Sequence, residues 1–244
     1  ATQADVAPGE QKGDWLFRVN IAQVDPDSDN LKLEKFEPVI PDSMLVVDSD
    51  LSATFDITYM FSNHFGVELL AAYPFTHGID VKPYSGSAPA RLGYVDHLPP
   101  TLSLVWRPGA YDATWQPYVG IGANWTMFSG EKLRGDTLGA LGLPSGTKLT
   151  MDDSFGFAGL VGLDIFPGEE KKWFMNLQVR YIQIGSDAEV SLPFGTDFTR
   201  TKVKLGTVDI NPMVYGIGFG RRFGQPAPVV EPTPPPPPPP PPPP

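Results

Sequence analysis

Residues 51–61 read LSATFDITYMF, and along this stretch large apolar residues alternate with mostly polar ones. Leu51, Phe55 and Phe61 share one phase of the alternation, and Asp56 has the other. Because successive side chains of a β-strand point to opposite faces, this period of two predicts a strand with one apolar and one polar face. Seven further stretches show the same period, at residues 14–24, 67–73, 101–106, 118–127, 155–165, 173–181 and 213–223. The sequence therefore predicts an all-β protein with eight strands.

Charged residues indicate which face of these strands is inside. Six of them lie opposite the apolar face: Arg18, Asp56, Glu68, Asp164, Arg180 and Arg222. A soluble barrel with an apolar interior could not hold so many charges unless they were paired, so we expect the polar face inside and the apolar face outside. An apolar exterior over eight strands exceeds any patch on a soluble monomer, whereas lipid tolerates it.

The connections between the predicted strands differ in length. Those after the second, fourth and sixth strands are short, at residues 62–64, 108–114 and 167–172, and the others are much longer. This asymmetry is typical of bacterial outer-membrane barrels. We expect an eight-stranded antiparallel up-and-down transmembrane β-barrel over residues 13–223, with long extracellular loops and short periplasmic turns. Residues 1–12 would form an N-terminal periplasmic segment and residues 224–244 a Pro-rich periplasmic tail.

Aromatic residues gather near the ends of the predicted strands. Those next to the short connections or the termini are Trp15, Tyr59, Phe61, Phe65, Trp106, Trp115, Phe166, Trp173 and Phe223. Those toward the long connections are Tyr73, Phe75, Trp125, Phe128 and Phe155. Because amphipathic rings prefer the headgroup layer, these two groups predict two aromatic girdles.

The composition excludes several functions. The 244 residues carry a net charge of −10, which argues against nucleic acid as a partner because phosphate binding needs Lys and Arg. The absence of cysteine excludes disulfides and thiolate metal or redox sites. No apolar run is long enough for a spanning helix. We expect no cofactor, and we expect outer-membrane lipids and lipopolysaccharide as surroundings.

Three patterns that resemble catalytic or ligand sites are weak. The loop at residues 25–30 has alternating oxygen ligands but lacks the glycine and glutamate of a calcium loop. The alternate glycines at residues 216–220 precede no helix, so they make room inside a barrel rather than bind phosphate. His77 and His97 show no spacing that supports a Ser-His-Asp triad, so we expect no enzyme.

Four blocks follow one another in a specific order and spacing: Thr58-Tyr59-Met60, GVELLAAYPF at residues 66–75, HLPPTL at residues 97–102, and PYVGIGANWT at residues 117–126. They resemble the OmpW/OprG family of small outer-membrane proteins, over nearly all of residues 13–223. The resemblance implies an eight-stranded barrel whose narrow apolar passage opens sideways into the membrane and takes up small hydrophobic molecules. One departure is Arg221, at an outward position of the last strand where an apolar or aromatic residue is more usual; its guanidinium would reach lipid headgroups.

Pro99 and Pro100 are predicted to form a lateral gate. A proline has no backbone N–H and so removes a bond from the strand ladder, and an unpaired carbonyl is costly in lipid. Near the outer end of the fourth strand, the two prolines would keep the wall from closing toward the third. The alternative is that the fourth strand begins only after Pro100.

Four apolar residues are predicted to point inward in the middle or outer half of their strands and to line a hydrophobic passage: Leu70, Ala72, Phe128 and Leu160. Below them we expect an interior polar network of Arg18, Asp56, Glu68, Arg180 and Arg222. Side chains fill a barrel of eight strands, so this network would close the lower barrel and direct a solute sideways. The alternative is plain packing of a filled barrel.

The sequence therefore predicts an outer-membrane channel for passive uptake of small hydrophobic molecules by lateral diffusion through the barrel wall. The alternative is a structural anchor, because residues 234–244 are all proline and would form an extended left-handed helix. Such a rod could bind an aromatic-lined groove on a periplasmic protein, or it could be an inert spacer.

Overall fold

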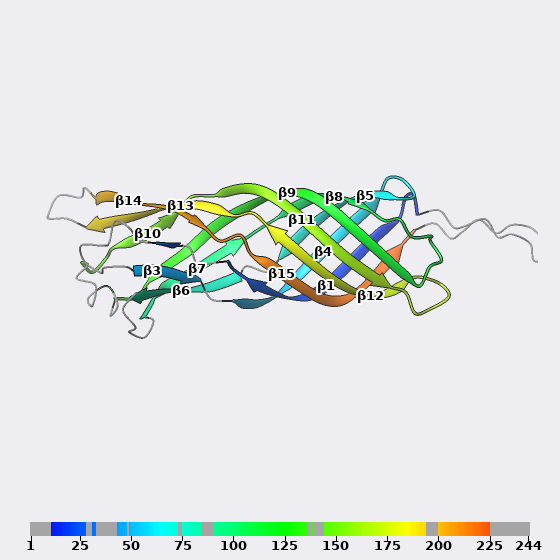
Figure 1. Ribbon diagram of the computed structural model, residues 1–244, viewed down its shortest axis with the longest axis horizontal. Coiled ribbons are helices and arrows are strands. Elements are labelled where there is room, and N and C mark those ends of the chain that lie inside the picture. The colour runs from blue at the N-terminus through cyan, green and yellow to red at the C-terminus, as the bar shows by residue number, and fades with distance from the viewer. Residues whose placement is uncertain are drawn as a thin grey trace, which may run out of the picture.

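The computed structural model describes residues 11–27, 31–32, 43–47, 49–72, 75–83, 90–135, 138, 144–193 and 200–224. Within this part, eight strands form the barrel: β1 (Trp15–Asp25), β4 (Asp50–Met60), β5 (Phe65–Ala72), β8 (Thr101–Trp106), β9 (Trp115–Leu133), β11 (Ser154–Ile165), β12 (Trp173–Ile182) and β15 (Met213–Phe223). Each pairs antiparallel with the next barrel strand along the chain, and β15 pairs with β1 and closes the barrel (Figure 1). The predicted eight-stranded antiparallel barrel is confirmed.

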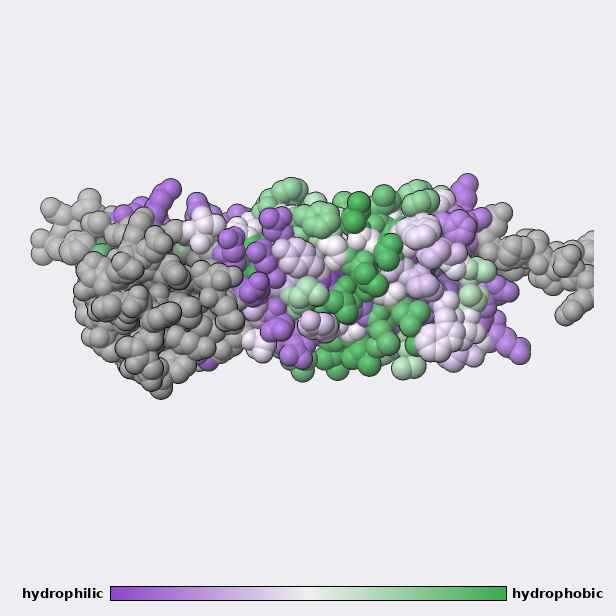
Figure 2. Space-filling view, in the orientation of Figure 1, coloured by the Kyte–Doolittle hydropathy of each residue, from purple (hydrophilic) through white to green (hydrophobic). Residues whose placement is uncertain are grey.

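The side chains alternate between the outside and the inside of the barrel as the sequence pattern predicts. Phe55 on β4 and Leu177 on β12 are exposed, whereas their neighbours along the chain, such as Asp56, are buried. Arg180, on the inner face of β12, is also buried. Figure 2 shows an apolar band across the middle of the visible face of the barrel, bordered by paler and more polar residues. The apolar face of each strand is therefore outside the barrel and the polar face is inside.

The two ends of the barrel are built differently. At the end where β1 begins and β15 finishes, residues 61–64, 107–114 and 166–172 form the short turns, as predicted (Figure 1). We call this the short-turn end. Most of residues 1–12 and all of the Pro-rich tail from residue 225 lie outside the described residues, so the predictions for them are not resolved here.

At the opposite end the long connections contain strands of their own, where the sequence pattern indicated only loops. β7 (Ala90–Leu98) extends the wall beside β9, and β6 (Phe75–Pro83), β3 (Ser43–Val47) and β2 (Leu31–Lys32) follow it in the same sheet. A second sheet contains β10 (Lys148–Met151), β13 (Gly185–Pro193) and β14 (Arg200–Asp209). In the described part of the chain, no helix has both the length and the hydropathy to cross a bilayer.

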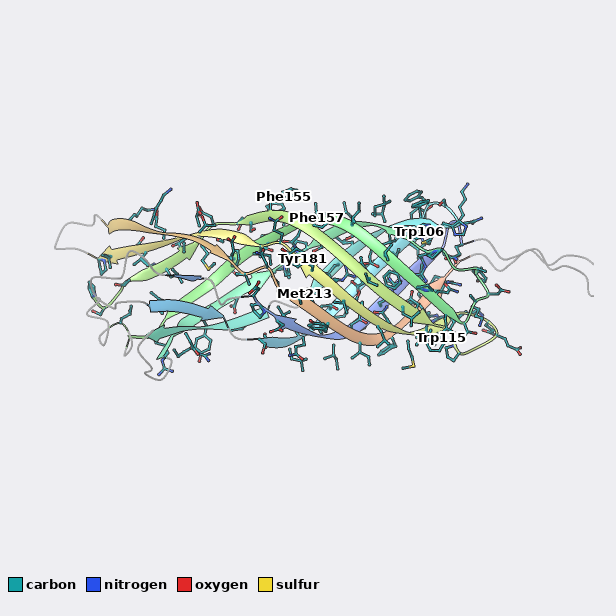
Figure 3. All side chains as sticks on the ribbon, in the orientation of Figure 1. Trp106, Trp115, Phe155, Phe157, Tyr181 and Met213 are labelled. Atoms are coloured by element: carbon teal, nitrogen blue, oxygen red, sulfur yellow. The ribbon has the colours of Figure 1, made fainter. Side chains whose placement is uncertain are left out.

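Most of the predicted girdle aromatics face outward. Figure 3 shows Trp106 and Trp115 near the short-turn end and Phe155 farther along the barrel, and all three are exposed. Phe166 is an exception, because it is fully buried against Phe174 and two other apolar side chains inside the short-turn end. It stands one residue beyond β11 but continues the inward phase of Gly162 and Asp164, and the predicted strand ended at Ile165, one residue too early to include it.

Candidate functional site: a polar plug beneath an apolar cavity

The predicted polar network occupies the barrel near the short-turn end, and Arg18 on β1 is one of its centres. Its guanidinium donates to both carboxylate oxygens of Asp164, at 3.1 and 2.7 Å. It also donates to Glu68 at 3.0 Å and to the hydroxyl of Thr58 at 2.7 Å. The bidentate pair with Asp164 fixes the direction of the guanidinium as well as its distance. Because its three partners lie on β4, β5 and β11, Arg18 links these strands to β1 from inside the barrel.

Arg180 on β12 forms the second centre. One of its nitrogens donates to Asp56 at 2.8 Å and to Glu68 at 2.6 Å. Glu68 therefore bridges Arg18 and Arg180 through its two oxygens. Asp56 also accepts from Asn20 at 2.7 Å and from Gln178 at 3.0 Å, so the amides fill the remaining acceptor positions of this carboxylate.

Three further charged residues belong to the network, although the predicted set did not include them: Asp164, Arg107 and Asp14. Asp164, which the alternation placed inward, is the shared partner of Arg18 and of Arg107, with Arg107 at 2.7 Å. Arg107 stands one residue beyond β8, outside the predicted strand. Extending the inward phase of Ser103 and Val105 by one step would have found it, because side chains two residues apart share a face.

Arg222 lies in a separate group closer to the short-turn end and does not contact Arg18 or Arg180 directly. It donates to Gln116 at 2.6 Å and approaches Asp14 at 3.5 Å. Gln116 also accepts from Arg107, which joins this group to the rest of the network. Burial raises the pKa of Asp14, just before β1, to about 6, and Arg222 and Arg107 only partly oppose that rise.

Among the described residues the buried charges balance. Four arginines face four carboxylates, namely Arg18, Arg107, Arg180 and Arg222 with Asp14, Asp56, Glu68 and Asp164. The ring of Tyr118 lies 4.9 Å from the Arg18 guanidinium and 5.2 Å from that of Arg107, and adds cation–π attraction. Buried charges are tolerated when they are paired and hydrogen-bonded, as most of these are, and we call this network the polar plug.

Above the plug the interior becomes apolar. Leu70 and Ala72 belong to a buried apolar cluster, and Phe128 packs against it. Leu160 does not join them, because it packs lower in the barrel with Val105 and Tyr118. The structure therefore brings together three of the four predicted passage residues and separates the fourth.

A small cavity lies within this apolar region. Its lining consists of Val24, Thr54, Leu70, Pro99, Ile182, Ile184, Pro212 and Val214. The cavity leaves about 10 Å³ for the centre of a water-sized molecule, which is room for about one water. Ile184 and Pro212 were missed because they lie beyond the ends of the predicted strands, although they continue the inward phase of Arg180 and Val214.

Pro99 and Pro100 interrupt one side of the wall at the level of this cavity. β7 ends at Leu98 and β8 begins at Thr101, yet both pair with β9. On the other side, pairing of β5 with β8 stops at Leu70↔Thr101, and pairing of β6 with β7 starts at Phe75↔His97. Among the described residues, no ladder pair joins Ala71 or Ala72 to the two prolines. We call these four residues the seam.

At the seam β8 begins only after Pro100, as the alternative stated, and another strand, β7, ends just before Pro99. The Pro100 carbonyl accepts from the backbone N–H of Trp125 on β9 at 3.0 Å, and the Pro99 carbonyl accepts from the Thr101 hydroxyl at 3.2 Å. Pro100 is therefore attached to β9, and among the described residues neither proline has a ladder pair on β5. Whether the seam opens stays a prediction.

A closed barrel with an apolar exterior and an ion-paired interior defines the class of small outer-membrane β-barrel proteins. Within that class the chain belongs to the OmpW family, whose model matches residues 11–223. It is an integral protein of the bacterial outer membrane and, as a member of this family, not an enzyme.

Individual relatives support this assignment. Over 213 residues the chain is 34% identical to outer membrane protein W of Vibrio cholerae, covering 87% of this chain and 90% of that protein. It is 27% identical to the outer membrane protein AlkL of Ectopseudomonas oleovorans, covering 86% and 82%. The crystal structure of OprG from Pseudomonas aeruginosa superimposes with a TM-score of 0.72 at 35% identity, covering 89% of this chain and 99% of OprG.

Proposed function

We propose that the barrel is a passive channel for small hydrophobic molecules. A solute enters from the extracellular side, crosses the apolar region and leaves sideways into the membrane between β5 and the two prolines. The observation that carries the proposal is the position of Pro99, which belongs to the seam and also lines the apolar cavity above the plug.

The interior makes the sideways route easier than the axial one. Along the axis, a solute would have to separate Arg18 and Arg180 from their carboxylates, and an apolar molecule cannot replace those hydrogen bonds. At the seam no backbone pairs between Ala72 and Pro99 need to break, and lipid lies outside. The cavity in its present form is too small for a solute, so passage requires Leu70 and its apolar neighbours to move apart.

Closing the seam tests this proposal directly. The double substitution Pro99→Val with Pro100→Val restores two backbone N–H groups and introduces good strand formers. Uptake of radiolabelled octane by cells that depend on the full chain should fall to the level of cells without it. The matched control is Pro108→Val with Pro167→Val, which changes two exposed prolines of the short turns and should leave uptake unchanged. Wild-type uptake in the seam variant would exclude lateral exit.

Filling the apolar region gives an independent test. Leu70 is 2% exposed and points into the cavity region, whereas its neighbour Leu69 is 45% exposed on the lipid side. Leu70→Trp should abolish octane uptake, and Leu69→Trp should preserve it. Equal uptake by the two variants would show that the solute does not pass this cavity.

We propose further that the short-turn end and both termini face the periplasm. The chain contains no cysteine, so single cysteines can be introduced without background. A membrane-impermeant maleimide applied to intact cells should label Thr150→Cys on β10 but not Asn63→Cys in the short turn after β4. The reverse pattern would invert the proposed orientation.

The anchoring alternative depends on residues 225–244, which lie outside the described residues. Ending the chain after Gly224 separates the two functions. A channel should keep its octane uptake, whereas an anchor should lose the periplasmic protein that binds the tail.

A further inference from the structure

A groove lies on the outer surface of the barrel, toward the short-turn end, where β1, β12 and β15 run side by side. Its volume is about 340 Å³, and its walls are almost entirely apolar. The main lining residues are Phe17, Val19, Trp173, Phe219, Arg221 and Phe223. Phe17 and Phe223 meet edge to face with their ring centroids 5.3 Å apart, which gives the groove a fixed aromatic wall.

Arg221 is the one charged residue of this groove. It is exposed on the outward face of β15, and its guanidinium lies 5.1 Å from the Trp173 ring centroid and 4.6 Å from that of Phe223. Among the described residues no carboxylate pairs with Arg221, in contrast to the adjacent Arg222, which approaches Asp14 inside the barrel. Aromatic faces attract the cation but do not neutralise it, so this exposed guanidinium is available to an anionic group.

The order of residues along the strands matches the order of groups in a phospholipid. Arg221 lies two residues from the end of β15, opposite Phe17 on β1. Phe219 and Val19 face each other one outward step farther from that end. At about 3.3 Å per residue and a strand tilt of about 40°, this pair lies roughly 5 Å deeper toward the middle of the barrel than Arg221. The charge therefore lies nearer the rim of the barrel than the apolar pair of Phe219 and Val19.

We propose that this groove is a binding site for one anionic phospholipid of the leaflet at the short-turn end. The phosphate binds the planar fork of Arg221, which suits phosphate oxygens, and one acyl chain lies against Phe17, Val19 and Phe219. Trp173 and Phe223 hold the guanidinium in place and so reduce the entropy lost on binding. The site is separate from the seam and does not depend on the proposed transport.

The charge contribution can be tested on the full chain in neutral detergent, with native mass spectrometry during titration with phosphatidylglycerol and with phosphatidylcholine. Wild-type protein should retain one phosphatidylglycerol more tightly than phosphatidylcholine. Arg221→Gln should weaken phosphatidylglycerol binding about tenfold, the usual effect of losing a charged hydrogen bond. Lys172→Gln, which removes an exposed cation from the same rim and outside the groove lining, should leave binding unchanged. An equal loss in both variants would show diffuse attraction and overturn the site.

The contribution of the acyl chain to binding can be tested with a second pair of variants, one inside the groove and one outside it. Val19 and Val67 are each 39% exposed on the lipid side, but only Val19 lines the groove. Val19→Phe should fill the groove and displace the lipid, whereas Val67→Phe should not. Equal binding by the two variants would overturn the proposal, as would displacement of the lipid by the same concentration of inorganic phosphate. This pair keeps the proposal testable if Arg221→Gln does not fold.

Discussion

The lower and upper interiors of the barrel are made by the same strands, yet their chemistry is opposite. On β5 the inward residue Glu68 is followed by Leu70, and on β12 Arg180 is followed by Ile182. The polar members join the ion-paired plug, and the apolar members join one buried cluster. A single step of two residues along a strand therefore separates a charged region from an apolar one.

This contrast explains how one barrel can be rigid and yielding in different places. The plug depends on directed, charge-assisted hydrogen bonds, which weaken steeply when the geometry changes. The apolar region depends on non-directional contacts, whose loss on a small movement is gradual. We therefore expect changes in the plug to alter mainly the unfolding free energy of the barrel, and changes in the apolar region to alter mainly the uptake of solute.

The largest expected effect comes from breaking the plug. Arg18→Met leaves Glu68 partly paired and removes one of the two arginines that hold Asp164, so buried negative charge is left uncompensated. We expect the barrel to lose about 3–5 kcal/mol of unfolding free energy, measured by guanidinium titration in detergent with tryptophan fluorescence. Lys172→Met removes an exposed ion pair with Glu170 and should leave the midpoint unchanged. Equal midpoints for the two variants would mean that the plug does not stabilise the barrel.

A smaller effect should follow from crowding the plug without changing its charge. A Cβ at Gly162 would overlap the ring of Tyr118, which packs beneath Arg18. Gly162→Ala should cost about 1–3 kcal/mol in the same titration. The control is Gly168→Ala in a short turn, where a Cβ meets nothing within 4 Å and the change should stay within about 0.5 kcal/mol. A stable Gly162→Ala barrel would show that the plug can rearrange.

The smallest stability effect is expected in the apolar region, where function should change instead. Ile182→Val removes one methyl group beside the cavity and should cost about 0.5–1.5 kcal/mol while it increases octane uptake. Ile217 is 55% exposed to lipid, so Ile217→Val is the matched control and should leave uptake unchanged. Reduced uptake in Ile182→Val would argue against this cavity as part of the route.

The sequence predicted the inward residues within the strands better than those just beyond the strand ends. Asp56 and Glu68 were recognisable as inward because each lies within a clear alternation. Arg107 was not included because it stands just past a strand end, and Phe166 was placed outside for the same reason. Leu160 has the inward phase that was predicted, but its height in the barrel places it beside Tyr118 rather than Leu70.

The amino-acid sequence by itself determined the eight barrel strands and their apolar outer face, because a period of two is a local property of each strand. Only the tertiary structure decided which inward residues meet. Height along the barrel axis depends on the register between neighbouring strands, and no single strand contains that information. Register therefore set the partners of Arg18, the separation of Leu160 from the cavity, and the position of the two prolines beside it.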